Sequence, residues 1–200
     1  GPTEAPWPMS AEILAFLGAG LLGGAVNAAA GGAKLFVFPL LLASGLPPIA
    51  ANVTQGVALW PAQLPAVWVY RRELRQDLRA LGRQAIPAMA GALAGALVMV
   101  NSSDEAFLRV VPLLLALSVV AIALGPRAAD LMRRAFPGGQ LGVATGVLLG
   151  AIGFYGGFFG AGIGFMLLAV LAASAGSGIG QVNGAKNLFA GAIQTVAVGP

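Results

Sequence analysis

Long apolar runs separated by short polar stretches are the feature of this sequence that most restricts its fold. A helix that crosses the hydrocarbon core of a membrane needs about 20 mostly apolar residues. Charged residues make up only 9% of the chain, against about 25% in a soluble domain, so they cannot cover a water-facing surface. The sequence therefore predicts an all-α polytopic membrane protein. The expected membrane segments are 11–30, 33–46, 49–70, 84–100, 107–125, 140–157, 161–175 and 180–198.

The charges between these segments predict how the chain is oriented. The stretch 71–83 carries five arginines and the stretch 126–139 carries three, whereas the N-terminal leader and the turn 101–106 carry carboxylates and no base. Because basic residues are enriched on the cytoplasmic side of a membrane, both basic stretches are expected in the cytoplasm and the N-terminus in the periplasm. Spanning-length apolar runs flank each basic stretch, which favours a cytoplasmic loop over a nucleic-acid-binding patch.

Two parts of the sequence, 20–58 and 149–189, share the same order of features. Each has an apolar approach, a glycine cluster, a second apolar run of less than spanning length, and a turn followed by a polar cluster that begins with asparagine. Five segments separate the copies, so they enter the membrane from opposite sides. This arrangement is typical of inverted-repeat transporters, in which short or broken helices line a site near the middle of the bilayer. Two glycine-rich helices can also resemble each other by chance.

The repeat predicts the organisation of the chain. Residues 1–10 are a leader or the remains of a tag, and 11–125 form a first repeat with about five membrane segments. Residues 126–139 form a basic cytoplasmic loop, and 140–200 form the second repeat. Counterparts of 71–125 are missing after the end of the second copy. We therefore expect this repeat to be incomplete and the C-terminal part of the chain to be truncated.

Two lysines inside the apolar segments indicate the kind of ligand. Lys34 follows the first glycine cluster, Lys186 lies in the polar cluster of the second copy, and no carboxylate lies deep in any segment. A buried cation costs several kcal/mol unless it is paired, and a bound anion would pair with it. Glycine breaks would also leave free N–H groups at helix starts, which bind anions. The predicted substrate-binding residues, in two half-sites, are Asn27, Gly31, Gly32, Lys34, Asn52, Thr54, Gln55, Tyr155, Gly160, Gly162, Asn183, Lys186 and Asn187.

Each of these features also has a purely structural explanation. Either lysine could extend to the membrane surface along its aliphatic stem. The asparagines and glutamines could form hydrogen bonds between helices, worth about 0.6 kcal/mol each. The glycines could serve helix packing, since pairs such as Gly91 and Gly95, or Gly153 and Gly157, lie four residues apart on one helix face.

Several kinds of chemistry are excluded by composition. The chain has no cysteine and no histidine, which excludes disulfides, thiolate chemistry, Cys/His metal sites and imidazole catalysis. We see no nucleophile–base pair either, and expect no enzyme activity, no metal and no cofactor. A membrane potential of about 100 mV, negative inside, favours outward movement of each negative charge by about 2.3 kcal/mol. Export of an anion therefore needs no second ion.

Two glycine-rich motifs resemble the paired signatures of a known family. The first reads NAAAGGAKLFVFPLLLASGLPPIAANVTQGVA, and the second reads GFYGGFFGAGIGFMLLAVL with NGAKN downstream. Both are similar to the sulfite exporter TauE/SafE family, over about residues 15–198. The resemblance implies a bacterial inner-membrane permease for sulfite, sulfoacetate or a related organosulfonate. The chain departs from the family pattern where Ala33 and Lys34 interrupt the glycine run, and in the missing C-terminal part.

The sequence leaves alternatives to a transporter open. An anion channel could use the same scaffold, and the incomplete second copy also fits a non-transporting membrane subunit. The expected partners are a small anionic substrate and the lipid bilayer, with no nucleic acid. Formation of a homo-oligomer is left open.

Overall fold

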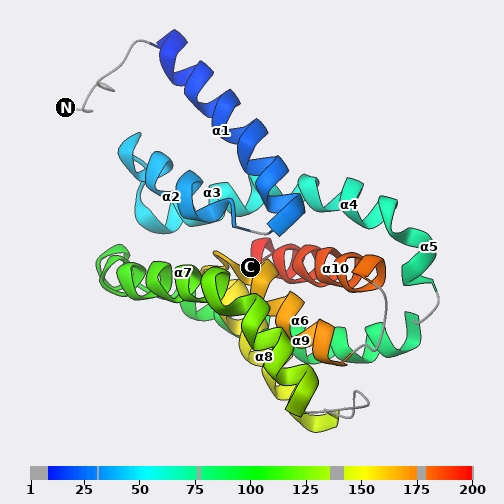
Figure 1. The fold of residues 1–200 in the computed structure, drawn as a ribbon. Helices are drawn as coiled ribbons and strands as arrows, with labels where there is room; N and C mark the ends of the chain where they lie inside the picture. Colours follow the sequence, from blue (N-terminus) through cyan, green and yellow to red (C-terminus); the bar gives the residue numbers. More distant parts are fainter. Residues whose placement is uncertain (1–8, 31, 76–77, 136–141, 175–178, 200) are drawn as a thin grey trace.

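The chain is all-helical in a computed structural model, which describes residues 9–30, 32–75, 78–135, 142–174 and 179–199. Within those ranges helices are joined by short turns and there is no strand, which confirms the all-α prediction (Figure 1). The elements are α1 (Met9–Ala30), α2 (Lys34–Ala43), α3 (Pro48–Leu59), the 3-10 helix η1 (Trp60–Ala62), α4 (Gln63–Val69), α5 (Arg71–Leu74), α6 (Leu78–Val100), α7 (Asp104–Ala135), α8 (Gly142–Phe158), α9 (Ile163–Ser174) and α10 (Ile179–Val198).

Each predicted membrane segment corresponds to one helix or to a run of helices. Segment 49–70 is divided into α3, η1 and α4, and the division falls at Pro61, which has no N–H to donate to a continuous helix. The stretches Leu78–Val100 and Asp104–Ala128 are long and apolar enough to cross a membrane. Helices α2 and α9 have only 10 and 12 residues, so neither can cross alone. In both predicted copies a short helix therefore stands between two longer elements.

Helix α7 extends further than the sequence predicts. It continues to Ala135, ten residues beyond the expected segment end at 125. The residues at 126–135 are mostly alanine, leucine, methionine and arginine, which favour helix, and they continue a helix that is already formed. The first ten residues of the stretch predicted as a loop are therefore helical. The last four, 136–139, lie outside the described residues.

Helices α6 and α8 approach more closely than side chains would allow. A β-carbon at Gly91 would overlap the carbonyl oxygen of Gly150, and one at Gly153 would overlap that of Ala88. The same relation recurs one turn further along each helix, at Gly95 and Gly157. For these glycines, close backbone packing is the explanation that the structure supports.

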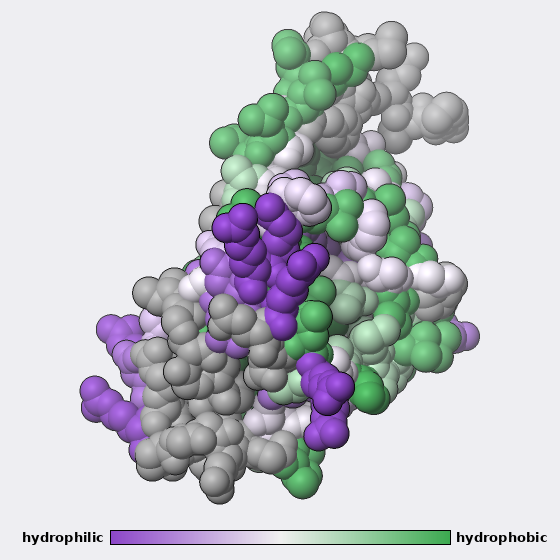
Figure 2. All heavy atoms as spheres, turned by 90° about the vertical axis from the view of Figure 1, so that its right-hand side faces the viewer, coloured by the Kyte–Doolittle hydropathy of each residue, from purple (hydrophilic) through white to green (hydrophobic). Residues whose placement is uncertain are grey.

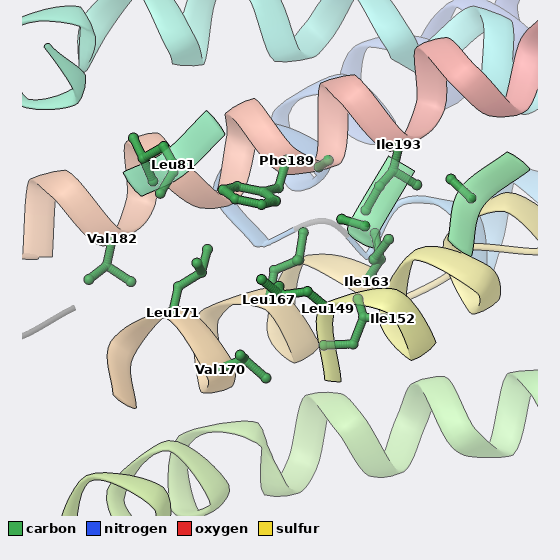
Figure 3. Close-up of a cluster of buried hydrophobic side chains, with 14 of the residues drawn as sticks. Leu81, Leu149, Ile152, Ile163, Leu167, Val170, Leu171, Val182, Phe189 and Ile193 are labelled. Atoms are coloured by element: carbon green, nitrogen blue, oxygen red, sulfur yellow. The ribbon is translucent and has the colours of Figure 1, made fainter. Parts of the chain in front are cut away.

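Buried apolar side chains form two clusters that hold the helices together. In the first, Leu167 of α9 points toward Phe189 of α10 (Figure 3). In the second, the ring of Phe38 packs edge-on against those of Phe107 and Phe159, with centroids 6.2 and 5.3 Å apart. The second cluster joins α2 to α7 and to the turn after α8, so it ties the two predicted copies together.

The outer surface of the described helices is largely apolar. Leu14 and Leu21 of α1, Leu113 of α7 and Val143 of α8 are each more than two thirds exposed. Seen from the side of α5, hydrophobic surface lies above and to the right of a small hydrophilic cluster (Figure 2). Such a surface would be unfavourable in water, but it matches the hydrocarbon core of a bilayer.

Candidate functional site

Lys34 is the first residue of α2, and only 6% of its surface is exposed. Its Nζ atom donates a hydrogen bond of 2.7 Å to the carbonyl oxygen of Phe159, 125 residues away in the sequence. The lysine side chain therefore extends into the protein toward the second predicted copy. Its burial argues against the alternative in which the ammonium group reaches the membrane surface.

The carbonyl groups opposite Lys34 belong to the end of α8. The helix ends at Phe158, and the amides of Phe159 and Gly160 both donate to the carbonyl of Tyr155 at 2.9 Å. Gly160 has a φ of +78°, which glycine adopts without strain. The carboxyl end of a helix carries a partial negative charge of about half a unit. It therefore stabilises the ammonium group without neutralising it.

Asn52 reaches the same helix end from α3. Its Nδ2 atom donates to the carbonyl oxygen of Phe158 at 3.0 Å and lies 2.9 Å from the sulfur of Met99. Its Oδ1 atom accepts a hydrogen bond of 3.0 Å from Nε2 of Gln55. These bonds fix the orientation of both amides. They leave Oε1 of Gln55 buried and without a partner in the described part of the chain.

A small cavity, lined by both polar and apolar groups, lies beside Lys34 and Asn52. Its walls also include Gly156 and Gly157 of α8 and Gln194 of α10. Its volume is about 20 Å³, whereas one water molecule needs about 10–15 Å³. Gln194 is 6% exposed, and its Oε1 atom has no partner among the described residues. Both predicted repeats therefore contribute polar side chains to one cavity.

Two hydroxyl groups anchor the loop that follows α8. The hydroxyl of Tyr155 lies 2.6 Å from Oγ of Ser118 and donates to the carbonyl of Ala161 at 2.7 Å. Oγ of Ser118 lies 3.0 Å from the same carbonyl. Tyr155 and Ser118 thus position the loop whose first carbonyl binds Lys34. Ser118 is absent from the predicted site, although a lone hydroxyl in the apolar segment 107–125 is a signal for it.

The other predicted residues of the first copy lie in different surroundings. Thr54 is exposed on α3. Asn27 is buried in α1, and its Nδ2 atom has no partner among the described residues. The carbonyl of Gly32 accepts the amide of Leu35, so at least one donor at the start of α2 is already used. Gly31 lies outside the described residues.

The other predicted residues of the second copy are distributed over α10 and the loop before α9. Lys186 and Asn187 are buried and Asn183 is half-buried. At about 1.5 Å per residue, Lys186 lies about 12 Å along α10 from Gln194, and it does not line the cavity beside Lys34. Gly162, with a φ of +73°, packs against Ser118. The structure thus brings the two lysines to different places.

Comparison with known proteins places this arrangement in a wider context. The sequence model of the family described as "Sulfite exporter TauE/SafE" matches residues 16–199. A protein from Sinorhizobium described as "Probable membrane transporter protein ORF9" is 29% identical over 171 residues, which cover 84% of this chain and 64% of that protein. The chain therefore spans less than two thirds of the length of this relative. No solved structure matches the chain.

Proposed function

Because this chain belongs to the sulfite exporter TauE/SafE family, we propose that it is a secondary transporter that exports a small anion such as sulfite, sulfoacetate or a related organosulfonate. Family membership makes it a polytopic membrane protein and confirms the resemblance of its glycine motifs. The observation that carries the proposal is the buried ammonium group of Lys34 beside a small cavity that Asn52 and Gln194 also line. The anion and the direction of transport are the proposed parts.

The charge at the cavity favours an anionic ligand. An ammonium group has three donors, and that of Lys34 makes a single hydrogen bond, to the carbonyl of Phe159. No carboxylate of the described residues forms an ion pair with it. The end of α8 offsets about half a unit of charge, so about half a unit of positive charge and two donors remain. Gln194 adds an amide that can turn its NH₂ group toward an anion.

The size of the cavity indicates what must change during transport. A cavity with room for about one water molecule is too small for sulfite, which has four non-hydrogen atoms. Its walls come from α2, α3 and α6 of the first predicted repeat and from α8 and α10 of the second. Movement of one group of helices against the other would widen it. Rocking of one repeat against the other is how inverted-repeat transporters expose a central site.

Flux measurements with purified protein in liposomes test the proposal. Unlabelled sulfite on one side should drive uptake of labelled sulfite against its gradient, which is called counterflow. Lys34→Met should reduce this counterflow at least about tenfold, because a hydrogen bond to a charged group contributes about 1.5–3 kcal/mol. Arg109→Gln, which removes an exposed cation paired with Glu105, is the matched control and should keep at least half the flux. Lys186→Met tests the second predicted half-site separately.

The outcomes separate the competing functions. Unchanged counterflow in Lys34→Met would exclude the proposed site while leaving transport intact. Anion flux that never saturates and shows no counterflow would instead identify a channel. Absence of flux for every small anion tried would favour a non-transporting subunit.

The proposed location is the inner membrane of a bacterium, with the N-terminus in the periplasm. The arginines of 71–83 support this orientation through the positive-inside rule. Because the chain has no cysteine, single cysteines can report the side of the membrane. In intact cells, an impermeant thiol reagent should label Ser103→Cys and spare Arg72→Cys, both exposed positions. The reverse pattern would invert the topology.

A further inference from the structure

A row of hollows runs along the seam between α10 and the chain from α3 to α5. The largest has a volume of about 550 Å³ and lies between α4 and α10. A second, of about 260 Å³, shares Trp60 and Thr195 with the first. Val198 lines both this second hollow and the cavity beside Lys34. The three hollows therefore lie next to one another, in a series that ends at Lys34.

The wide end of this series is basic. Arg71 and Arg75 line the largest hollow. The guanidinium group of Arg71 lies 4.3 Å from the ring centroid of Trp68 and donates to the carbonyl of Trp68 at 2.7 Å. The tryptophan thus holds one of the two cations at the opening. A pair of arginines at the mouth of a groove raises the local concentration of anions.

The middle of the series is lined mostly by apolar side chains, with a few polar groups among them: Gln63, Thr195 and the indole N–H of Trp60. Trp60 precedes Arg71 by 11 residues, which is about 16 Å of helix and about half of a hydrocarbon core of about 30 Å. Gln63 lines the large hollow, is 3% exposed, and its Oε1 atom has no partner in the described part of the chain. Polar side chains at this depth face a water-filled cavity or the interior of a helix bundle. Gln63 therefore places a buried polar group in the wall of an otherwise apolar hollow.

A single hydrogen bond crosses the boundary between the two larger hollows. Nε1 of Trp60 donates to Oγ1 of Thr195 at 2.8 Å, and Oγ1 of Thr195 donates to the carbonyl of Gly191 at 2.8 Å. The bond joins residues 135 positions apart, one from each predicted repeat. It lies where the series narrows from about 550 Å³ to about 260 Å³, on the way to the cavity beside Lys34.

We propose that this seam is the route by which the anion reaches Lys34 from the arginine-rich side, with Arg71 and Arg75 as its entrance and the Trp60–Thr195 contact as its gate. The route rests on the proposed transport function. The proposed route assigns two further roles: Arg71 and Arg75 select for negative charge before the substrate reaches the cavity, and the Trp60–Thr195 contact separates the entrance from the site.

The entrance is tested by the salt dependence of transport. In the double variant Arg71→Gln/Arg75→Gln, KM for sulfite added on the arginine-rich side should rise roughly tenfold over wild type at low ionic strength. This difference in KM between variant and wild type should shrink at 1 M salt, where the screening length falls to about 3 Å. Arg127→Gln/Arg134→Gln is the matched control, because these arginines line a separate hollow on α7. An equal rise in KM in both double variants would overturn the role of the entrance.

The gate is tested with a cysteine at Thr195. The chain has no other cysteine, so an anionic thiol reagent added on the arginine-rich side should modify Thr195→Cys, and modification should abolish counterflow. Sulfoacetate, which unlike sulfite does not itself react with thiol reagents, should slow the modification. Modification that leaves counterflow unchanged would overturn the route while the transport proposal stands. Protection by anionic lipid and not by sulfoacetate would identify the seam as a lipid site and also overturn it. Absence of counterflow in the unmodified wild-type protein would overturn transport and route together.

Discussion

Gly160 combines a special backbone conformation with close contact to Lys34, so replacing it with alanine has a calculable effect. Its φ is +78°, and a residue with a β-carbon is about 1–2 kcal/mol less stable in this backbone conformation than glycine. The added carbon would lie 2.7 Å from the carbonyl oxygen of Gly156 and 3.2 Å from Nζ of Lys34. The first contact involves backbone, so the added carbon pushes instead on the ammonium group and weakens its bond to Phe159. A hydrogen bond to a charged group contributes about 1.5–3 kcal/mol. We therefore expect Gly160→Ala to lower the free energy of unfolding by about 2.5–5 kcal/mol.

Gly162→Ala is the matched control for this substitution. Gly162 has a φ of +73°, so alanine pays the same backbone cost there, but the added carbon faces Ser118 at 3.3 Å and not Lys34. Thermal unfolding of both variants in detergent, with and without sulfite, separates the two contributions. Both should be destabilised, and only Gly160→Ala should lose its stabilisation by sulfite. Wild-type stability of Gly160→Ala, or an equal loss of the sulfite response in Gly162→Ala, would refute the reasoning.

Three further substitutions test other parts of the fold. Gly153→Leu should destabilise the protein by about 3 kcal/mol or more. Overpacking a well-packed interface typically costs about 1–3 kcal/mol, and here the added side chain meets the backbone of α6. Gly20→Leu is the control: nothing lies within 4 Å of that position, so it should have little effect in the same thermal-unfolding assay. Tyr155→Phe should lower the free energy of unfolding by about 1–2 kcal/mol. A double-mutant cycle with Ser118→Ala should show a coupling energy of at least about 0.5 kcal/mol. Strictly additive effects would disprove that the two hydroxyls act together. Glu105→Gln breaks an ion pair whose side chains are 77% and 76% exposed, and it should change stability by less than about 0.5 kcal/mol in chemical denaturation.

Apolar length predicted the helices well because a membrane imposes it. The eight predicted segments all correspond to helical parts of the chain, including the two that are too short to span. The failure at 126–135 has a physical reason. Charge was interpreted as the end of a helix, but arginine is a good helix former, and a helix can leave the membrane without unwinding.

Side-chain polarity predicted part of the candidate site. Lys34, Asn52 and Gln55 stand out as polar groups in apolar runs, and the structure brings Lys34 and Asn52 to neighbouring carbonyl groups of one helix end. The carbonyls themselves, from Phe158 and Phe159, have no signature in a sequence, because every residue has one. Which polar groups meet depends on long-range packing, and for that reason the distance between the two lysines was not predictable.

The hydrogen bond from Lys34 to Phe159 has a consequence for how the protein is made. The acceptor lies 125 residues after the donor in the sequence. At a translation rate of about 5–20 residues per second, Phe159 is therefore synthesised roughly 6–25 seconds after Lys34. Throughout that time a cation must be accommodated by the insertion machinery, by water or by lipid head groups. We therefore expect the first half of the chain to reach its final position in the bilayer only after the end of α8 has been synthesised. Insertion of the chain would then depend on contact between its two halves.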